Sequence, residues 1–116
     1  MRDLVQTFAA ALPGATLDHN FGPAIDSWKV GGKLFAIAGA EGVSVKCPDR
    51  ETAAMLVEVG QAEPAPYLAH AGWVRVSAEA LAAGNVTDAD LEHRLRVSYD
   101  TIVATLPKRL HPTPEA

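Results

Sequence analysis

The chain has few of the residues that mark secreted, metal-binding or membrane proteins. Its 116 residues include one cysteine, four histidines, and only three Phe, two Trp and two Tyr. A single cysteine excludes an intrachain disulfide, so we expect a reducing compartment, with the cytoplasm as the default. No stretch approaches the ~20 apolar residues of a membrane span, and the N-terminus lacks the uninterrupted apolar run of a signal peptide. We therefore expect no membrane partner.

Basic residues are also in the minority. The chain has 10 Lys and Arg against 14 Asp and Glu, for a net charge of −4. Proteins whose main task is to grip nucleic acid are usually basic, because phosphate contacts supply most of the affinity. The total charge therefore argues mildly against that role. Residues 29–50 differ, since they hold four bases and two acids and form the only locally positive segment.

No residue pattern reaches the quality of a catalytic or metal-binding motif. None of the histidines lies at zinc-ligand spacing from another soft ligand. His19 has Asp18 beside it and Asp26 nearby, a pairing that can orient an imidazole for acid–base chemistry. No nucleophile accompanies it in a recognisable motif, so a surface turn is the preferred interpretation. We predict no catalytic residue, no metal and no cofactor.

Two further features have ordinary structural explanations. Cys47 is in phase with Val43 and Val45 along a predicted strand, which favours an inert, buried thiol. Gly31-Gly32 lacks the longer glycine spacing of a phosphate-binding loop, and a strand rather than a helix follows it. We therefore interpret the glycine pair as a hairpin turn.

Apolar spacing predicts both helices and strands. Helices are expected over residues 4–12, 50–59 and 88–106, and strands over 27–30, 33–37, 43–47 and 73–77, with a short edge strand within 15–21. Short consecutive strands joined by tight turns are antiparallel. The predicted class is α+β, an antiparallel sheet with helices packed on one face as a two-layer sandwich. We predict one domain over residues 1–110 and a flexible, Pro-rich tail over 111–116.

The clearest local signal is the hairpin around Gly31-Gly32. A two-residue turn with positive φ joins strands tightly, and it places Trp28 opposite Phe35. Cross-strand partners share a face. The pattern therefore predicts one core face with Trp28, Val30, Phe35 and Ile37, and it places Lys29 on the other side.

The face away from the helices is the candidate site. If the valines of each strand point to the core, then Lys29, Lys46, Trp73 and Arg75 point outward, and Lys33 lies at the hairpin. Cations beside an indole are typical of a nucleic-acid platform, in which charge meets phosphates and the ring stacks on bases. In the alternative interpretation, which is the preferred one for Trp73, the indole is covered by the connector 61–70. A second function then arises, a protein- or small-ligand-binding adaptor that uses this face or Tyr67 and His70 of the connector.

Several segments together resemble one known family. They are Leu12-Pro13-Gly14-Ala15-Thr16, Asp18-His19, Phe21-Gly22, Lys29-Val30-Gly31-Gly32-Lys33-Leu34-Phe35-Ala36, Val43-Ser44-Val45-Lys46-Cys47, Pro66-Tyr67-Leu68, Trp73-Val74 and Ser98-Tyr99. In order and spacing they resemble the MmcQ/YjbR family from about residue 10 to about residue 110.

That resemblance implies a frataxin-like (CyaY-like) fold and a DNA-binding protein with a double-wing motif. The chain departs from its relatives before the tryptophan, where they often carry a more basic run and this sequence has Ala69-His70-Ala71-Gly72. We therefore expect any DNA binding to be weak and independent of sequence.

Overall fold

The computed structural model describes residues 1–66 and 68–113, without the side chain of His70. Residues 114–116 of the predicted tail lie outside the described part. The helical elements are α1 (Arg2–Ala10), α2 (Arg50–Glu58), η1 (Ala69–Ala71), α3 (Ala78–Ala82), α4 (Asp88–Thr105) and η2 (Lys108–Leu110). The strands are β1 (Thr16–Asp18), β2 (Asp26–Val30), β3 (Lys33–Gly39), β4 (Gly42–Lys46), β5 (Glu63–Pro64) and β6 (Trp73–Ser77).

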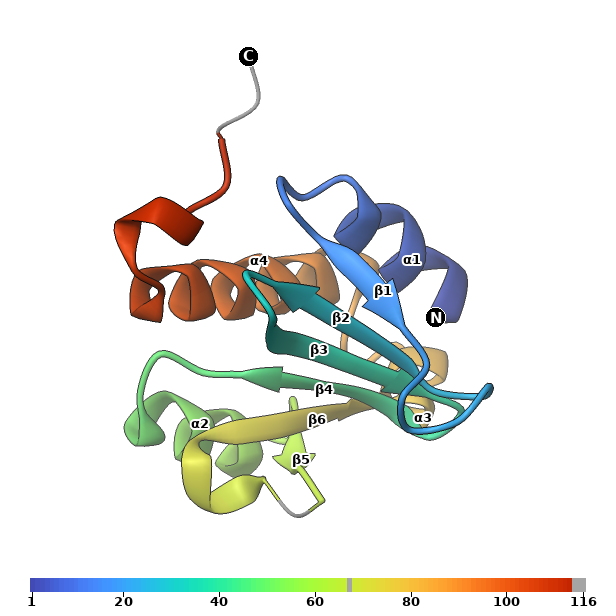
Figure 1. Cartoon of the computed structure of the whole chain (residues 1–116). Helices are drawn as coiled ribbons and strands as arrows, with labels where there is room; N and C mark the ends of the chain where they lie inside the picture. Colours follow the sequence, from blue (N-terminus) through green and yellow to red (C-terminus); the bar gives the residue numbers. More distant parts are fainter. Residues whose placement is uncertain (67, 114–116) are drawn as a thin grey trace.

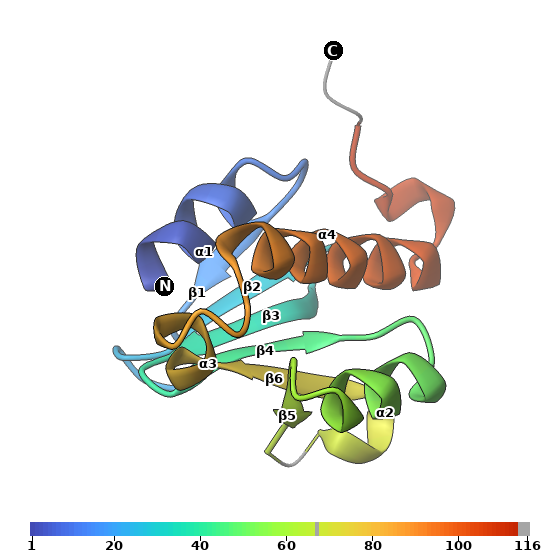
Figure 2. The same ribbon diagram turned by 180° about the vertical axis from the view of Figure 1, so that it is seen from behind.

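The six strands form one sheet in the order β1-β2-β3-β4-β6-β5. Every neighbouring pair is antiparallel. Figure 1 shows the sheet with the helices behind it, and Figure 2 shows α1 and α4 lying across the sheet from the other side. The predicted α+β class, with the first and last helices on the same face, is confirmed. None of the described helices is both long and apolar enough to cross a membrane.

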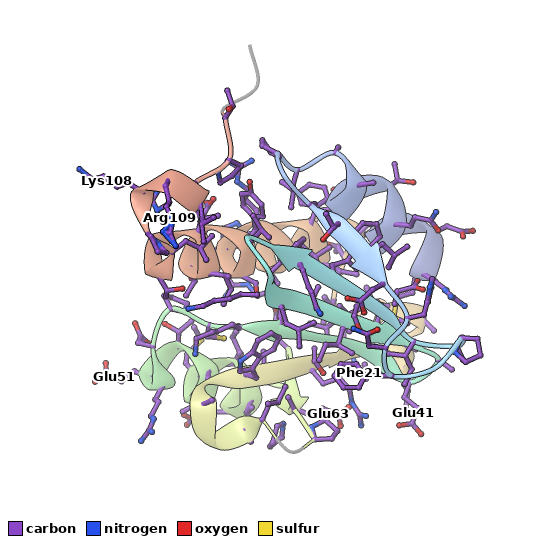
Figure 3. All side chains as sticks on the ribbon, in the orientation of Figure 1. Phe21, Glu41, Glu51, Glu63, Lys108 and Arg109 are labelled. Atoms are coloured by element: carbon purple, nitrogen blue, oxygen red, sulfur yellow. The ribbon has the colours of Figure 1, made fainter. Side chains whose placement is uncertain are left out.

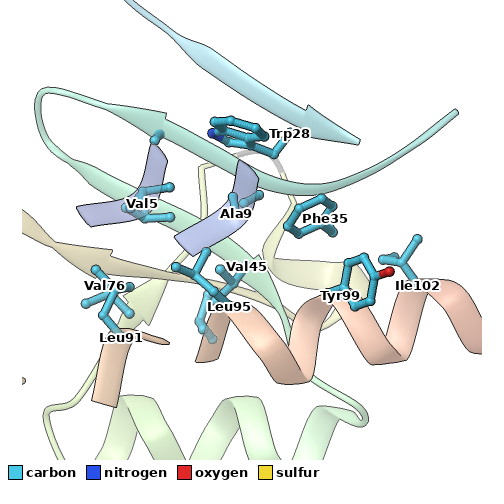
Figure 4. Close-up of a cluster of buried hydrophobic side chains, with 14 of the residues drawn as sticks. Val5, Ala9, Trp28, Phe35, Val45, Val76, Leu91, Leu95, Tyr99 and Ile102 are labelled. Carbon is cyan, nitrogen blue, oxygen red and sulfur yellow. The ribbon is translucent and has the colours of Figure 1, made fainter. Parts of the chain in front are cut away.

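The core lies between the sheet and these helices. Fully buried side chains from α1, the sheet and α4 meet there, among them Val5, Phe35, Val45, Leu91 and Leu95 (Figure 4). Burial of this apolar surface is the main favourable contribution to folding. One side of the sheet is thereby covered by the core, so a site formed by the sheet lies on the other side of the sheet or at its ends.

The long helix α4 forms where the sequence predicts it. Thr87 accepts a hydrogen bond from the N–H of Asp90, and the Asp90 carboxylate accepts one from the N–H of Thr87, so the two residues form a capping box at the start of the helix. Its buried residues recur at helical spacing and include Leu91, Leu95 and Ile102. This capped stripe fixes α4 across the middle of the sheet.

The hairpin register differs from the prediction by a β-bulge. Trp28 pairs with Ala36, whereas Lys29 pairs with Leu34, so Phe35 is the extra residue. Phe35 is fully buried and its ring meets that of Tyr99 of α4 edge-on, so it does face the core, as predicted. The bulge reverses the alternation beyond it. The prediction that Ile37 lies in the core is wrong, because Ile37 pairs with Ser27 on the opposite face and is only half-buried.

A serine from α4 holds the bulge in place. The buried Ser98 hydroxyl donates to the carbonyl of Phe35 at 2.6 Å and accepts from the N–H of Lys46 at 2.9 Å. It therefore joins the backbones of β3 and β4 at the point where the ladder is interrupted. Backbone polar groups that are buried need such partners.

Candidate nucleic-acid interface

The outward face of the sheet carries the predicted cations, but acids accompany them. Lys29 forms an ion pair with Asp18 of β1 at 2.9 Å between Nζ and Oδ2. The register explains this contact, since Asp18 pairs with Ser27, which is two residues from Lys29 and therefore on the same face. The hydrogen bond from Lys29 lowers the pKa of Asp18, helped by the backbone N–H of Asn20. The carboxylate of Asp18 therefore largely neutralises the positive charge of Lys29.

Arg75 is neutralised more completely. Its Nε donates to Glu63 of β5 at 2.8 Å, and its Nη1 lies 3.1 Å from Glu41 of the β3–β4 turn. The hydrogen bond to Glu63 raises the pKa of Arg75, and Glu41 adds to this effect. Glu41 and Glu63 both lie at the same corner of the sheet in Figure 3. A phosphate approaching Arg75 would therefore meet two carboxylates.

The other two predicted outward residues are also engaged. The ammonium of Lys46 donates to the carbonyl of Ala71 in η1. Trp73 is 8% exposed, so its indole is covered rather than presented to a base. The preferred interpretation of Trp73, burial beneath the connector, agrees with this value, since Trp73 shares a pocket with Pro64 and Ala69 of that segment. Tyr67 lies outside the described residues, and so does the side chain of His70.

The structure gathers cations elsewhere, at one end of the molecule. In both Figure 1 and Figure 2, the β2–β3 hairpin, the end of β4, the start of α2 and η2 all lie toward that end. Lys33 of the hairpin donates to Thr105 at 3.3 Å, which connects it to the C-terminal end of α4. We call the following five residues the cationic end: Lys33, Lys46, Arg50, Lys108 and Arg109.

Half of the chain's ten basic residues belong to the cationic end. Two acids, Asp49 and Glu51, flank Arg50 of the cationic end in the sequence. Asp49 is occupied as the cap of α2, where its carboxylate accepts a hydrogen bond from the N–H of Thr52 at 2.7 Å. Figure 3 shows Lys108 projecting from η2 toward solvent, and Arg109 is exposed as well. Sequence reasoning found Lys33 and Lys46 but missed Lys108 and Arg109, because they lie far along the chain and only the packing of α4 brings its C-terminal end, which they follow, to the hairpin.

An apolar pocket of about 340 Å³ lies beside the connector. Side chains of α2, β5, η1 and β6 line it, chiefly Ala54, Val57, Pro64, Ala69 and Trp73. Glu58 is the charged residue of its lining. The connector is one of the two places where the alternative function, binding of a small ligand, predicts a site.

A buried carboxylate anchors the N-terminal part of the fold. The Asp26 side chain is 4% exposed and binds the Arg2 guanidinium through two hydrogen bonds of 2.7 and 2.8 Å. His19 Nε2 lies 2.9 Å from the same carboxylate. Of the two acids considered for His19, Asp26 is therefore its partner. The arrangement ties α1 and the β1–β2 loop to the sheet, and no nucleophilic side chain joins it among the described contacts.

This cluster predicts an acid-dependent loss of stability. The hydrogen bonds from Arg2, and next the single hydrogen bond with His19, hold the pKa of Asp26 below its ordinary value. A carboxyl whose pKa is lower in the folded state stabilises the fold above its unfolded pKa, and that stabilisation disappears as the pH falls through the folded pKa. We expect Asp26→Asn to cost about 1–3 kcal/mol at pH 7, and the difference from the wild type to vanish in strong acid.

Urea denaturation at a series of pH values measures this effect. The matched control is Asp100→Asn, which removes the exposed Asp100–Arg96 ion pair within α4 and should change the free energy of unfolding by less than about 0.5 kcal/mol. Equal effects of the two substitutions, or a difference that does not shrink as the pH falls below the ordinary pKa of an aspartate, would show that Asp26 does not act through its charge.

Cys47 is 2% exposed, and burial raises the pKa of its thiol. The predicted burial is confirmed, and a buried thiol of raised pKa is a poor nucleophile. Among the described residues, no three His, Cys, Asp or Glu side chains gather in a way that would hold a metal ion.

Comparison with known proteins relates the chain to one family and to a solved structure. The model of the YjbR family matches residues 10–101. The crystal structure of the Deinococcus radiodurans protein DR2400, which carries the DUF419 domain, has a TM-score of 0.81 and 21% sequence identity, and the match covers 95% of this chain and 84% of that chain. At this identity the likeness concerns the fold alone. No curated protein matches the chain significantly.

Proposed function

This chain belongs to the YjbR family, and we propose that it binds nucleic acid weakly, without sequence preference, through its cationic end. The observation that supports this proposal is the gathering of Lys33, Lys108 and Arg109 around the end of α4 in a chain whose net charge is −4. Phosphate contacts require cations that are free to meet them. We therefore assign the phosphate contacts to this end and not to Lys29 and Arg75, which carboxylates already hold.

The expected binding is governed by charge. If about five cations each neutralise one phosphate, log K should fall with log salt at a slope of about −4 on duplex DNA. In the rest of the chain acidic residues outnumber basic ones. Their negative charge opposes the long-range attraction of nucleic acid, so the affinity should be low at physiological salt. Stacking on Trp73 contributes nothing in this arrangement, and single strands should have no advantage from it.

We test the proposal with two triple variants of equal net charge. Lys33→Gln with Lys108→Gln and Arg109→Gln removes three cations of the cationic end. Lys29→Gln with Arg75→Gln and Arg96→Gln removes three cations that are paired with carboxylates. In fluorescence anisotropy titrations with a short labelled duplex at two salt concentrations, the first variant should weaken binding about 10- to 100-fold and flatten the slope by about 2–3.

The second variant should bind nearly as the wild type does. Circular dichroism checks that both variants fold. If the two variants lose equal affinity, the binding depends on net charge alone and not on the cationic end. If the wild type does not bind the duplex at low salt, the proposal is wrong.

The pocket beside the connector favours a second candidate function, the binding of a small apolar ligand. Pockets that bind such ligands are concave and mostly apolar, with a few polar groups that fix orientation. Glu58 is the charged group of this pocket. A ligand seated there would contact Trp73, so a titration with such a ligand should change the fluorescence of this indole.

A further inference from the structure

The outer side of the helical layer carries a groove with an acidic character. It lies between α1 and α4, has a volume of about 500 Å³, and is lined by Leu4, Thr7, Phe8 and Ala11 together with the carboxylates of Asp3 and Glu92. Leu4 and Phe8 are half-buried, so the groove exposes part of their apolar surface. An apolar surface with acids beside it fits an apolar side chain that is flanked by cations.

The chain itself carries such a segment. In η2, Leu110 is 41% exposed and directly follows Lys108 and Arg109, both of which are also exposed. Within the described part of the chain, neither of these two cations forms an ion pair. The segment therefore presents one apolar side chain and two unneutralised positive charges.

Groove and segment lie at opposite ends of the same helix. Glu92 is in the first third of α4, and η2 follows its C-terminal end. Figure 2 shows α1 and η2 along the same edge of the molecule, with α4 between them. An α4 of 18 residues is about 27 Å long, too far for η2 to reach the groove of its own chain. Two copies with their α4 helices antiparallel would bring the η2 segment of each to the groove of the other.

We propose that the protein forms a two-fold dimer in which Leu110, Lys108 and Arg109 of each copy dock into the α1–α4 groove of its partner. Leu110 meets Leu4 and Phe8, and the two cations meet Asp3 and Glu92. Because the two contacts are identical and reciprocal, the assembly closes at two copies. The charge complementarity favours a second copy over an unrelated partner, since the acids and the cations occur in the same chain.

Two charge-reversed variants test this arrangement by sedimentation velocity across a concentration series. One is Asp3→Lys with Glu92→Lys, and the other is Lys108→Glu with Arg109→Glu. All four residues lie at the surface, and circular dichroism checks the fold. Each variant alone should weaken self-association at least about tenfold, because like charges then face each other.

Mixing the two variants is the decisive step. The reversed groove of one faces the reversed segment of the other, and the remaining contact keeps its natural charges, so the mixture should restore a 1:1 dimer. Leu110→Asp should abolish dimers in every combination. A wild type that stays monomeric at the highest concentration, or a dimer that neither reversal weakens, would overturn the proposal.

The outcome is separable from that of the nucleic-acid experiment. Lys108 and Arg109 take part in both proposed contacts, so in the dimer they are not free for phosphates, and self-association competes with nucleic-acid binding. The Asp3 and Glu92 variant keeps the whole cationic end, so it should bind nucleic acid at least as tightly as the wild type while failing to self-associate. Loss of both properties in that variant would count against the dimer, because it would indicate a general disturbance of the surface.

Discussion

Replacing Phe35 by alanine should lower the free energy of unfolding by about 3–5 kcal/mol, a large part of the total stability of a domain of this size. Phe35 is fully buried at the bulge, and its ring meets Tyr99 at a centroid distance of 5.4 Å and an interplanar angle of 86°. The substitution removes this edge-to-face contact and leaves a cavity under the centre of the sheet, which neighbouring backbone cannot fill. Urea denaturation followed by circular dichroism gives the change.

Phe21 provides the matched control, because the same substitution there removes a ring that is 56% exposed on the β1–β2 loop. We expect Phe21→Ala to change the stability by less than about 0.5 kcal/mol. A cost below about 1 kcal/mol for Phe35→Ala would mean that Phe35 is not at the centre of the core.

Gly42→Ala should be similarly destabilising, at about 3–5 kcal/mol, for a different reason. A Cβ at position 42 would lie 2.4 Å from the carbonyl oxygen of Val76 and 3.0 Å from the Cα of Ser77. Both are backbone atoms of β6, which pairs with β4 at this point, so neither can move without breaking the ladder. Thermal and urea unfolding both measure the loss.

The control separates steric clash from backbone strain. Gly32 of the hairpin has a φ of +81°, and a Cβ there would meet nothing within 4 Å. Gly32→Ala therefore incurs only the cost of a left-handed conformation, about 1 kcal/mol. If the two alanine variants lose equal stability, the close approach of β4 and β6 at Gly42 is not the cause.

Local patterns in the sequence predicted those parts of the fold that depend on local physics. Apolar residues at helical spacing predicted α4, and the glycine pair predicted the hairpin. The bulge at Phe35 could not be predicted in this way. It is stabilised by Ser98, which lies 63 residues further along the chain, and no property of the hairpin sequence indicates that partner. The prediction for Ile37 was wrong because the bulge reverses the alternation along β3.

The candidate site was predictable to a similar extent. Alternation along the strands correctly put Lys29 and Arg75 on the outward face, because that inference needs only the period of a strand. Their neutralisation by Asp18, Glu41 and Glu63 depends on which strands are neighbours, and the sequence does not state that order. That the hairpin lies beside the C-terminal end of α4, from which η2 follows, likewise depends on where α4 ends once it is packed.

The bridge made by Ser98 has a consequence for how the protein opens. The amide of Lys46 donates to a side chain of α4 rather than to a carbonyl of a neighbouring strand. Its protection against hydrogen exchange therefore depends on the contact between the helix and the sheet and not on the ladder alone. Exchange at this single amide reports when α4 lifts from the sheet, even in openings that leave the strands paired.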